Sequence, residues 1–521
     1  MNASDWSDFE PDDRLVRLGE WSVSLRGCEL ADVAFEGRRL LRGIRFVVRD
    51  HDWRTARNIA ERVDVDAAAG VLELEARSMY GDRGVVEWRI RLTADGGTIT
   101  ADVSAKVTVA FRRNRVGLIV LQSPELAGKK LTVVHSDDSV DETQFPTTIA
   151  PHQPALDVSG YDWDTNGVSA HLRFAGDIFE MEDQRNWTDA SYKTYSTPLS
   201  DPFPVDMTPG DVIEQSLTLT ADLTSSQAPS AIEGADSPIE LDDPFDIAPI
   251  TAEPPTIQFG ASTAPDEPAA DARGPSTTIL VEIPADEPCW PAVFDRALAD
   301  ASGGSIDVRI IFRDPHELAP VVAALRGLPV VRVGIFDRRT HLSSPELLPE
   351  LRRIATEIGC EAVAGTRAHF TELNRSIDLL GAWEGPLTFS ITPQMHDTSK
   401  AQLVESLAMQ RVVAENAVRL AARRPLHIGP VTLRPRFNAV ATSPFYPSTA
   451  GDVRAGYGAE FVTDSTDPRQ HSPTTARWRQ ASIAALSVPG VQSVTYFEAW
   501  GPRGVVADRM SWQKWAGLTP A

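Results

Sequence analysis

The chain has 521 residues, of which 42% are hydrophobic and 24% are charged, as expected for a globular protein of about two to four domains. Its 73 acidic residues outnumber its 50 basic residues, which leaves a net charge of −23. So negative a protein is repelled by phosphate backbones and by anionic lipid, so we expect neither nucleic acid nor a membrane surface as a partner.

The start of the chain, MNASDWSDFEPDDRL, lacks the basic end and the apolar core of a secretory signal. No apolar run reaches the length of about 18 residues that suggests a transmembrane helix. The three cysteines, Cys28, Cys289 and Cys360, are odd in number and far apart, so they predict neither a disulfide framework nor a CxxC metal site. We therefore expect a cytoplasmic protein with reduced thiols.

Residues 1–225 are predicted to form an antiparallel β-sandwich. Short segments with period-two alternation, such as VLELEAR, VVEWRIRLTAD and VIEQSLTLTADL, are separated by turn signals such as GDRG and ADGG. Many short alternating strands with frequent turns favour this fold, and no useful helical periodicity interrupts them. Residues 226–276 are rich in Pro, Ala, Asp and Ser, and we interpret them as an extended linker that lies over a domain surface.

Residues 277–521 are predicted to form a TIM-type, (β/α)₈-like barrel. Apolar β-branched runs alternate with helical patterns, which indicates a parallel sheet covered on both faces. The seven runs are TTILVEIP, SIDVRIIF, PVVRVGIF, CEAVAGTRAHF, PLTFSITPQ, PLHIGPVTL and VQSVTYFEAW. An eighth strand is expected within 437–468, where AEFVT is the best segment.

The active site of such a barrel lies at the carboxyl ends of its strands, where polar side chains of this chain gather. The candidates after successive strands are Arg367, His369, Glu372, Asn374 and Arg375; Gln394, His396 and Asp397; Thr432, Arg434, Arg436 and Asn438; Asp467, Arg469 and His471; Tyr496, Glu498, Trp500 and Arg503. Each of these candidates also has a purely structural interpretation. The arginines would form ion pairs with acidic residues, Glu498 would form an ion pair with an arginine, and the histidines would be hydrogen-bonded within the core.

Glu372 and Glu498 are the leading catalytic pair, because two carboxylates at one barrel mouth suit general acid and base chemistry. A glycoside hydrolase uses such a pair. Ester or lactone hydrolysis needs a base for water and a donor for the oxyanion, and His396 is a second candidate for either role. Arg434 and Arg436 suit a carboxylate or an oxyanion. The GxSxG, Walker, GxGxxG and HExxH motifs are absent, and no cofactor or metal is predicted, although a metal held by His and Glu stays open.

One segment of the sandwich region does not resemble a strand. Residues 179–195, FEMEDQRNWTDASYKTY, here called the acidic–aromatic block, hold four carboxylates among basic, amide and aromatic side chains. The block resembles a long, near-fixed segment of the bacterial D-apionate lactonase family. Other segments resemble the same family: LRGIRFVVRDHDW, RNRVGLIVLQSP, FTELNR, VTLRPRFNAVAT and SVTYFEAWGPRG.

The resemblance implies a hydrolase that opens D-apionolactone to D-apionate in the catabolism of apiose, with a small sugar lactone as its partner. The chain differs in ending soon after the last predicted strand, where family members continue with a helix and further β structure. A glycoside hydrolase with the two glutamates, or a non-catalytic carbohydrate-binding protein, is the alternative.

We expect the acidic–aromatic block to reach over the barrel mouth. Its acids would meet Arg434 and Arg436, and its aromatic rings would close over the ligand. In the rival interpretation the block only holds the two domains together. The side chains predicted to bind substrate are Glu180, Asp183, Asn186, Trp187, Tyr192, Asn374, Arg434, Arg436 and Tyr496.

Overall fold

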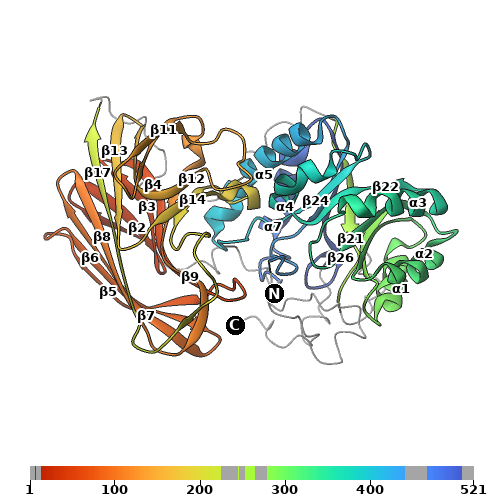
Figure 1. Ribbon diagram of the computed structural model, residues 1–521, viewed down its shortest axis with the longest axis horizontal. Coiled ribbons are helices and arrows are strands. Elements are labelled where there is room, and N and C mark those ends of the chain that lie inside the picture. The colour runs from red at the N-terminus through yellow and green to blue at the C-terminus, as the bar shows by residue number, and fades with distance from the viewer. Residues whose placement is uncertain are drawn as a thin grey trace.

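The computed structural model describes Trp6, Phe245 and residues 13–224, 253–264, 278–440 and 466–506. It has two parts that lie side by side, an antiparallel β part and a part with a parallel sheet and helices (Figure 1). The predicted strand AEFVT, residues 459–463, lies outside the described residues. In the part of the chain described, no helix is long and apolar enough to cross a membrane.

Seventeen strands pair in the antiparallel part. They are β1 (Asp13–Leu18), β2 (Trp21–Arg26), β3 (Glu29–Phe35), β4 (Arg38–Asp50), β5 (Arg57–Asp66), β6 (Val71–Tyr80), β7 (Arg83–Asp95), β8 (Thr98–Val107), β9 (Phe111–Gln122), β10 (Lys130–His135), β11 (Val140–Gln144), β12 (Ala155–Thr165), β13 (Val168–Ala175), β14 (Phe179–Asp183), β15 (Tyr192–Tyr195), β16 (Val205–Met207) and β17 (Val212–Leu223). Several of them, such as β6, β8 and β13, have the period-two burial that the sequence predicts.

Turn chemistry sets the register of these strands. β3 and β4 pair up to Phe35 and Arg38, which leaves Glu36 and Gly37 as a two-residue turn. Both turn residues have positive φ, 49° and 71°, as the tightest hairpins require, and glycine adopts this conformation at little cost. β4 then pairs with β9 over most of its length, and the alternating apolar side chains of both strands enter the core of the antiparallel part.

The second part is built on parallel strands with helices packed around them. The strands are β18 (Thr256–Gly260), β19 (Thr278–Pro284), β20 (Ser305–Phe312), β21 (Val330–Asp337), β22 (Glu361–Ala362), β23 (Ala364–His369), β24 (Leu387–Ile391), β25 (Leu426–Val431), β26 (Val491–Trp500) and β27 (Gly504–Val506). The helices are α1 (Trp290–Ala301), α2 (Leu318–Leu325), α3 (Leu348–Ile358), α4 (Phe370–Ser376), α5 (Lys400–Ala421) and α7 (Pro473–Leu486).

The parallel sheet closes into a barrel-like structure. β18 pairs with β19 on one side and with β26 on the other. The two ends of the sheet, β22 and β23, are separated only by Val363, whose N–H donates to Val333 O at 2.9 Å. The segment 226–276, predicted to be a linker, therefore contains a strand of this sheet. Five residues flanked by proline-rich sequence give too weak a periodic signal to be recognised.

Ion pairs join the two parts at the face where β4 meets the start of α5. Arg45 on β4 pairs with Asp397 just before α5, and Arg42 pairs with Glu405 on the helix. α5 begins at a Ser399 side chain that accepts from the Gln402 N–H at 3.2 Å, a regular helix cap. Although burial opposes its ionisation, Asp397 has a pKa well below its ordinary value because Arg45 and Arg42 are adjacent.

Candidate active site

A cavity of about 960 Å³, here called the large cavity, lies between the two parts. One wall comes from β4, β9 and the acidic–aromatic block. The opposite wall comes from residues that follow β23, β24 and β25, at the carboxyl ends of the parallel strands. Of the predicted catalytic and substrate-binding residues, Trp187, Glu372, His396 and Arg434 line this cavity. The further strand-end candidates that line it are His369, Arg375, Gln394 and Asn438. Side chains more than 180 residues apart in the chain thus share one space.

Glu372 is a lining carboxyl whose pKa is raised toward neutrality. It lies in the first turn of α4, directly after β23. Burial raises the pKa of its carboxyl from 4.5 to about 7, while the N–H groups of Glu372 and His369 oppose this rise. Its Oε2 is buried and has no hydrogen-bond partner among the described residues. A carboxyl that titrates near neutral pH, with one oxygen unused, can accept or donate a proton within the cavity.

Two imidazoles line the same cavity. Burial, with Arg436 and His396 nearby, lowers the pKa of His369 to about 3, so this ring is neutral at physiological pH. His396 Nδ1 lies 2.8 Å from Asp189 Oδ2, and its ring packs edge-on against Trp187. Burial lowers the pKa of His396 well below its ordinary value and raises that of Asp189, so both groups favour their uncharged forms.

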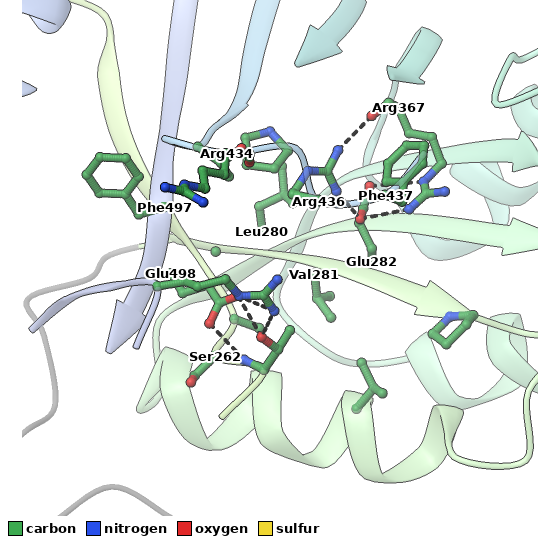
Figure 2. A pocket seen from close by; sticks show the side chains of 18 of the residues that line it. Ser262, Leu280, Val281, Glu282, Arg367, Arg434, Arg436, Phe437, Phe497 and Glu498 are labelled. Atoms are coloured by element: carbon green, nitrogen blue, oxygen red, sulfur yellow. Dashed lines mark hydrogen bonds and ion pairs between the residues drawn. The ribbon is translucent and has the colours of Figure 1, made fainter. Parts of the chain in front are cut away.

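A second, smaller cavity of about 140 Å³ opens among the ends of β18, β19 and β26 (Figure 2). Glu282, near the end of β19, pairs with Arg367 at 3.0 Å and with Arg436. These two guanidinium groups lower the pKa of Glu282 to about 2, although burial acts in the opposite direction. Glu282 is therefore a permanent anion that holds the two arginines. It is not a group that exchanges protons near neutral pH.

Glu498 lies on this small cavity and not on the large one. Its carboxylate accepts from Thr263 Oγ1 at 2.7 Å and from Thr263 N at 3.0 Å, and it pairs with Arg503 at 3.0 Å. The structure therefore does not bring Glu372 and Glu498 together in one cavity. The salt-bridged alternative describes Glu498, because both of its oxygens are engaged.

Arg434 belongs to both cavities, as does Phe437. Among the described residues, its only ion pair joins Nε to Asp467 Oδ2 at 3.1 Å. Figure 2 shows its guanidinium extending into the space between Phe497 and Arg436. Arg436 instead pairs with Glu282 and donates to Arg367 O at 2.7 Å. The predicted contact of these arginines with the acidic–aromatic block is wrong, because other acids of the barrel-like part hold them.

The block's own polar atoms are paired within or next to it. Asp183 pairs with Arg185 at 2.7 Å and accepts from Ala150 N. Glu180 accepts from the Tyr195 hydroxyl and from Leu199 N. Both carboxylates are buried and line neither cavity. Their predicted role in binding substrate is corrected to a structural one, because both carboxylates accept hydrogen bonds within the antiparallel part and neither reaches a cavity.

Both predicted tyrosines are also structural. Tyr192 is fully buried, and its hydroxyl donates to Pro146 O at 2.6 Å. Tyr496 is equally buried, and its hydroxyl bonds to Ser482 on α7 at 2.8 Å. Neither ring lines a cavity. Tyr192 therefore does not close over a ligand, and Tyr496 belongs to the core under the helices.

Amide contacts connect the acidic–aromatic block to the barrel-like part. Asn374 Nδ2 donates to Asn186 Oδ1 at 2.9 Å, and Asn186 Nδ2 donates to Ala150 O. Thr188 Oγ1 donates to Thr392 O at 3.1 Å. The docking interpretation fits these residues, and neither asparagine lines a cavity. Trp187 is different: it lies on the cavity wall, with the Arg375 guanidinium 5.4 Å from its ring centre.

Sequence reasoning missed several cavity residues. Glu282 is the only carboxylate within the apolar run TTILVEIP. A single charged residue in an otherwise apolar strand indicates a special role, so this residue could have been predicted. Lys193 and Tyr195 lay inside the acidic–aromatic block without being chosen. Arg49 and Arg115 come from strands whose pairing the sequence does not reveal, although each lies in a segment that resembles the family.

The fold and the site together define a protein with an antiparallel β part, a barrel-like parallel part, and a cavity between them that is lined by Glu372, whose pKa burial raises. Two family models match the chain: "D-apionate lactonase, N-terminal domain" over residues 1–224 and "D-apionate lactonase, TIM barrel domain" over residues 337–521. The chain belongs to the D-apionate lactonase family, which confirms the resemblance seen in its sequence.

Comparison with individual proteins agrees with this membership. A D-apionate lactonase of Brucella anthropi is 26% identical over 533 residues, covering 94% of this chain and 83% of that protein. A β-arabinopyranosidase structure covers 80% of this chain and 67% of its own, at 6% identity and a TM-score of 0.29. A glycoside hydrolase family 97 enzyme from Pseudoalteromonas sp. strain K8 covers 82% and 67%, at 10% identity and a TM-score of 0.28. These two structural scores carry no functional information.

Proposed function

We propose that this protein hydrolyses a sugar-acid lactone, D-apionolactone to D-apionate, in the catabolism of apiose. Family membership supports lactone hydrolysis in carbohydrate metabolism, and the choice of D-apionolactone follows the name of the relative. We further propose that the antiparallel part is a β-sandwich and the parallel part a (β/α)₈-like barrel. A cytoplasmic location suits three cysteines that form no disulfide.

The observation that carries the proposal is the position of Glu372. Its carboxyl is buried beside a cavity large enough for a pentose lactone, it titrates near pH 7, and it keeps one oxygen free of partners among the described residues. A general base works best when its pKa lies near the operating pH. Two other cavity carboxyls are unsuited to this role, because Lys193 outweighs burial and lowers the pKa of Glu182, and Arg367 and Arg436 lower that of Glu282.

The reaction balances with Glu372 as the proton carrier. Its carboxylate takes a proton from water, and the hydroxide adds to the lactone carbonyl to give a tetrahedral oxyanion. The ring C–O bond then breaks, the ring oxygen receives the proton from Glu372, and the carbonyl carbon remains as a carboxyl. The net change is the addition of one water, and the new carboxyl loses a proton to solvent.

Donors around the cavity supply the remaining roles. Arg434 presents N–H groups next to both cavities and would hold the oxyanion and then the new carboxylate, whose planar shape matches a guanidinium. His369, neutral at physiological pH, can donate one N–H to a sugar hydroxyl or to the carbonyl oxygen. Trp187 offers an apolar face for the C–H side of the ring. His396 would act by fixing Trp187 and Asp189.

The test is acid release on a panel of aldonolactones, followed by titration at constant pH with the wild type and Glu372→Gln. We expect the wild type to release one acid equivalent per lactone and to prefer the branched pentonolactone. A wild-type protein that binds these lactones without releasing acid would overturn the proposal in favour of a non-catalytic carbohydrate-binding protein.

The glycoside hydrolase alternative loses its geometric basis in this structure. It requires two carboxyl groups on opposite sides of one glycosidic bond, whereas Glu372 and Glu498 line different cavities. Glu182 lies on the large cavity but is paired with Lys193. Aryl glycosides are therefore expected to be left intact.

A further inference from the structure

The walls of the large cavity carry a charge opposite to that of the whole protein. Seven cationic side chains and two carboxylates line it, in a chain whose net charge is −23. The cations are Arg49, Arg54, Arg57, Arg115, Lys193, Arg375 and Arg434, and the carboxylates are Glu182 and Glu372. Asp50 and Asp467, outside the lining, pair with Arg54 and Arg434, which leaves five cations against the two carboxylates. A lactone ring is neutral, so its binding alone does not account for this excess. A cavity so lined concentrates anions.

Two of these cations are placed in a way that costs stability. Arg49 on β4 and Arg115 on β9 are directly opposite each other in the antiparallel register, and both line the cavity. Like charges at opposed positions of neighbouring strands repel. Neither arginine forms an ion pair within the described residues, where most other buried arginines are held by acids. Their neighbours Val47 and Gly117 also line the cavity, which leaves an apolar floor beside the two charges.

Arg115 is the less exposed of the two arginines. It is only 5% exposed, and its Nε and Nη2 have no hydrogen-bond partner in the part of the chain described. Its guanidinium lies 5.3 Å from the ring centre of Trp53 and 5.0 Å from that of Phe203. Burial lowers the pKa of Arg115 and of Arg49. A buried guanidinium with unused donors is costly unless an anion completes it.

We propose that Arg49 and Arg115 form a carboxylate-binding subsite on the wall of the large cavity that β4 and β9 build. The rings of Trp53 and Phe203 hold the Arg115 guanidinium in place, and a planar guanidinium fork matches the two oxygens of a carboxylate. This subsite lies on the wall opposite Glu372, so it binds the ligand at a different point from the reacting base.

The ligand is the carboxylate of a sugar acid, and the inference rests on the proposed lactone hydrolysis. That carboxylate has two possible sources. It is either the group that ring opening creates, which leaves Arg434 for this subsite so that the product is retained, or a second carboxylate already present on the lactone, in which case the subsite selects acidic lactones.

The experiment measures thermal stabilisation of the full chain by D-gluconate, by D-glucaro-1,4-lactone and by neutral D-gluconolactone, with ionic strength matched by sodium chloride. It compares the wild type, Arg115→Gln and Arg49→Gln with the control Arg112→Gln, which changes an exposed arginine of β9 that lines neither cavity. Without ligand, neither cavity variant should melt below the wild type, because a repelling charge is removed.

We expect the two carboxylates to stabilise the wild type and the control, and their apparent Kd to rise at least about 10-fold in each cavity variant. If gluconate inhibits turnover and loses that inhibition in Arg115→Gln, while the KM for gluconolactone stays, the product is the source. If glucaro-1,4-lactone has the higher kcat/KM and loses its advantage in Arg115→Gln, the substrate is the source. Equal stabilisation of all four proteins by the carboxylates, or none in the wild type, would overturn the subsite. Thermal stabilisation by a carboxylate can be measured without turnover. The test of the subsite therefore still gives an answer if the protein hydrolyses none of the lactones.

Discussion

Replacement of Glu372 by Gln tests the centre of the proposed mechanism, because it removes the ionisable group and keeps the shape. The folded protein holds the pKa of this carboxyl at about 7, against an ordinary value of 4.5. At about 1.36 kcal/mol for each pKa unit, the ionised carboxylate costs the folded state about 3 kcal/mol. This is an upper bound, because part of the Glu372 residue surface is exposed.

The sign of this effect depends on pH. Below pH 4.5 the carboxyl is protonated in both the folded and the unfolded chain, and it costs nothing. Between pH 4.5 and 7 the unfolded chain ionises first, so the wild type loses stability as pH rises. Above pH 7 both states are ionised and the full cost is present. The free energy of unfolding of Glu372→Gln should therefore rise relative to wild type from pH 4.5 to pH 8, by up to about 3 kcal/mol.

The assay combines urea unfolding at several pH values with initial rates of lactone loss. We expect kcat to fall by about 10²- to 10⁴-fold in Glu372→Gln, as for the loss of a general base, and the wild-type rate to rise with pH through about 7. Glu384→Gln, at an exposed site, is the matched control. A Glu372→Gln variant with wild-type kcat, or a stability difference that stays constant with pH, would refute the reasoning.

Three further predictions follow from the contacts. Asn186→Ala leaves Asn374 without its partner amide and should lower the free energy of unfolding by about 1–3 kcal/mol with kcat little changed; a lost kcat at an unchanged melting temperature would instead place Asn186 on the ligand. Glu498→Gln should change kcat by less than about 10-fold, and a loss above about 100-fold would return this glutamate to the reaction. Asp397 contributes stability above its ordinary pKa of 3.8 that is lost as pH falls below it, because Arg45 lowers its folded pKa. In urea unfolding, Asp397→Asn should reduce the decrease in the free energy of unfolding as pH falls. An unchanged decrease in the variant would contradict the stabilising role of the Asp397 ion pairs.

Sequence patterns predicted the elements better than the contacts of their side chains. The strand ends led to Glu372 and Arg434, because parallel strands bring their carboxyl ends to one edge. They also led to Tyr496, which is buried. Alternation along β26 breaks at Phe497, whose φ is 43°, where the register with β18 shifts. No residue pattern announces such a break, so the side on which Glu498 lies relative to Tyr496 was beyond prediction.

Contacts between side chains on neighbouring strands could not be predicted from the sequence either. Arg49 and Arg115 are far apart in the chain and meet only through the register of β4 with β9. The acidic–aromatic block was recognised as unusual, but its composition suits a ligand site and a domain contact equally well. The geometry decides between them residue by residue: Trp187 faces the cavity, whereas Asn186 bonds to Asn374.

The position of β18 has a consequence for how the protein is made. Gln258 on this strand bonds to Thr495 on β26, 237 residues later in the chain, and the two strands pair along their length. During synthesis the earlier strand must wait for nearly the whole barrel-like part to leave the ribosome. Such distant pairing slows folding, so this half of the molecule is expected to mature after translation, while the β part ahead of it is free to fold first.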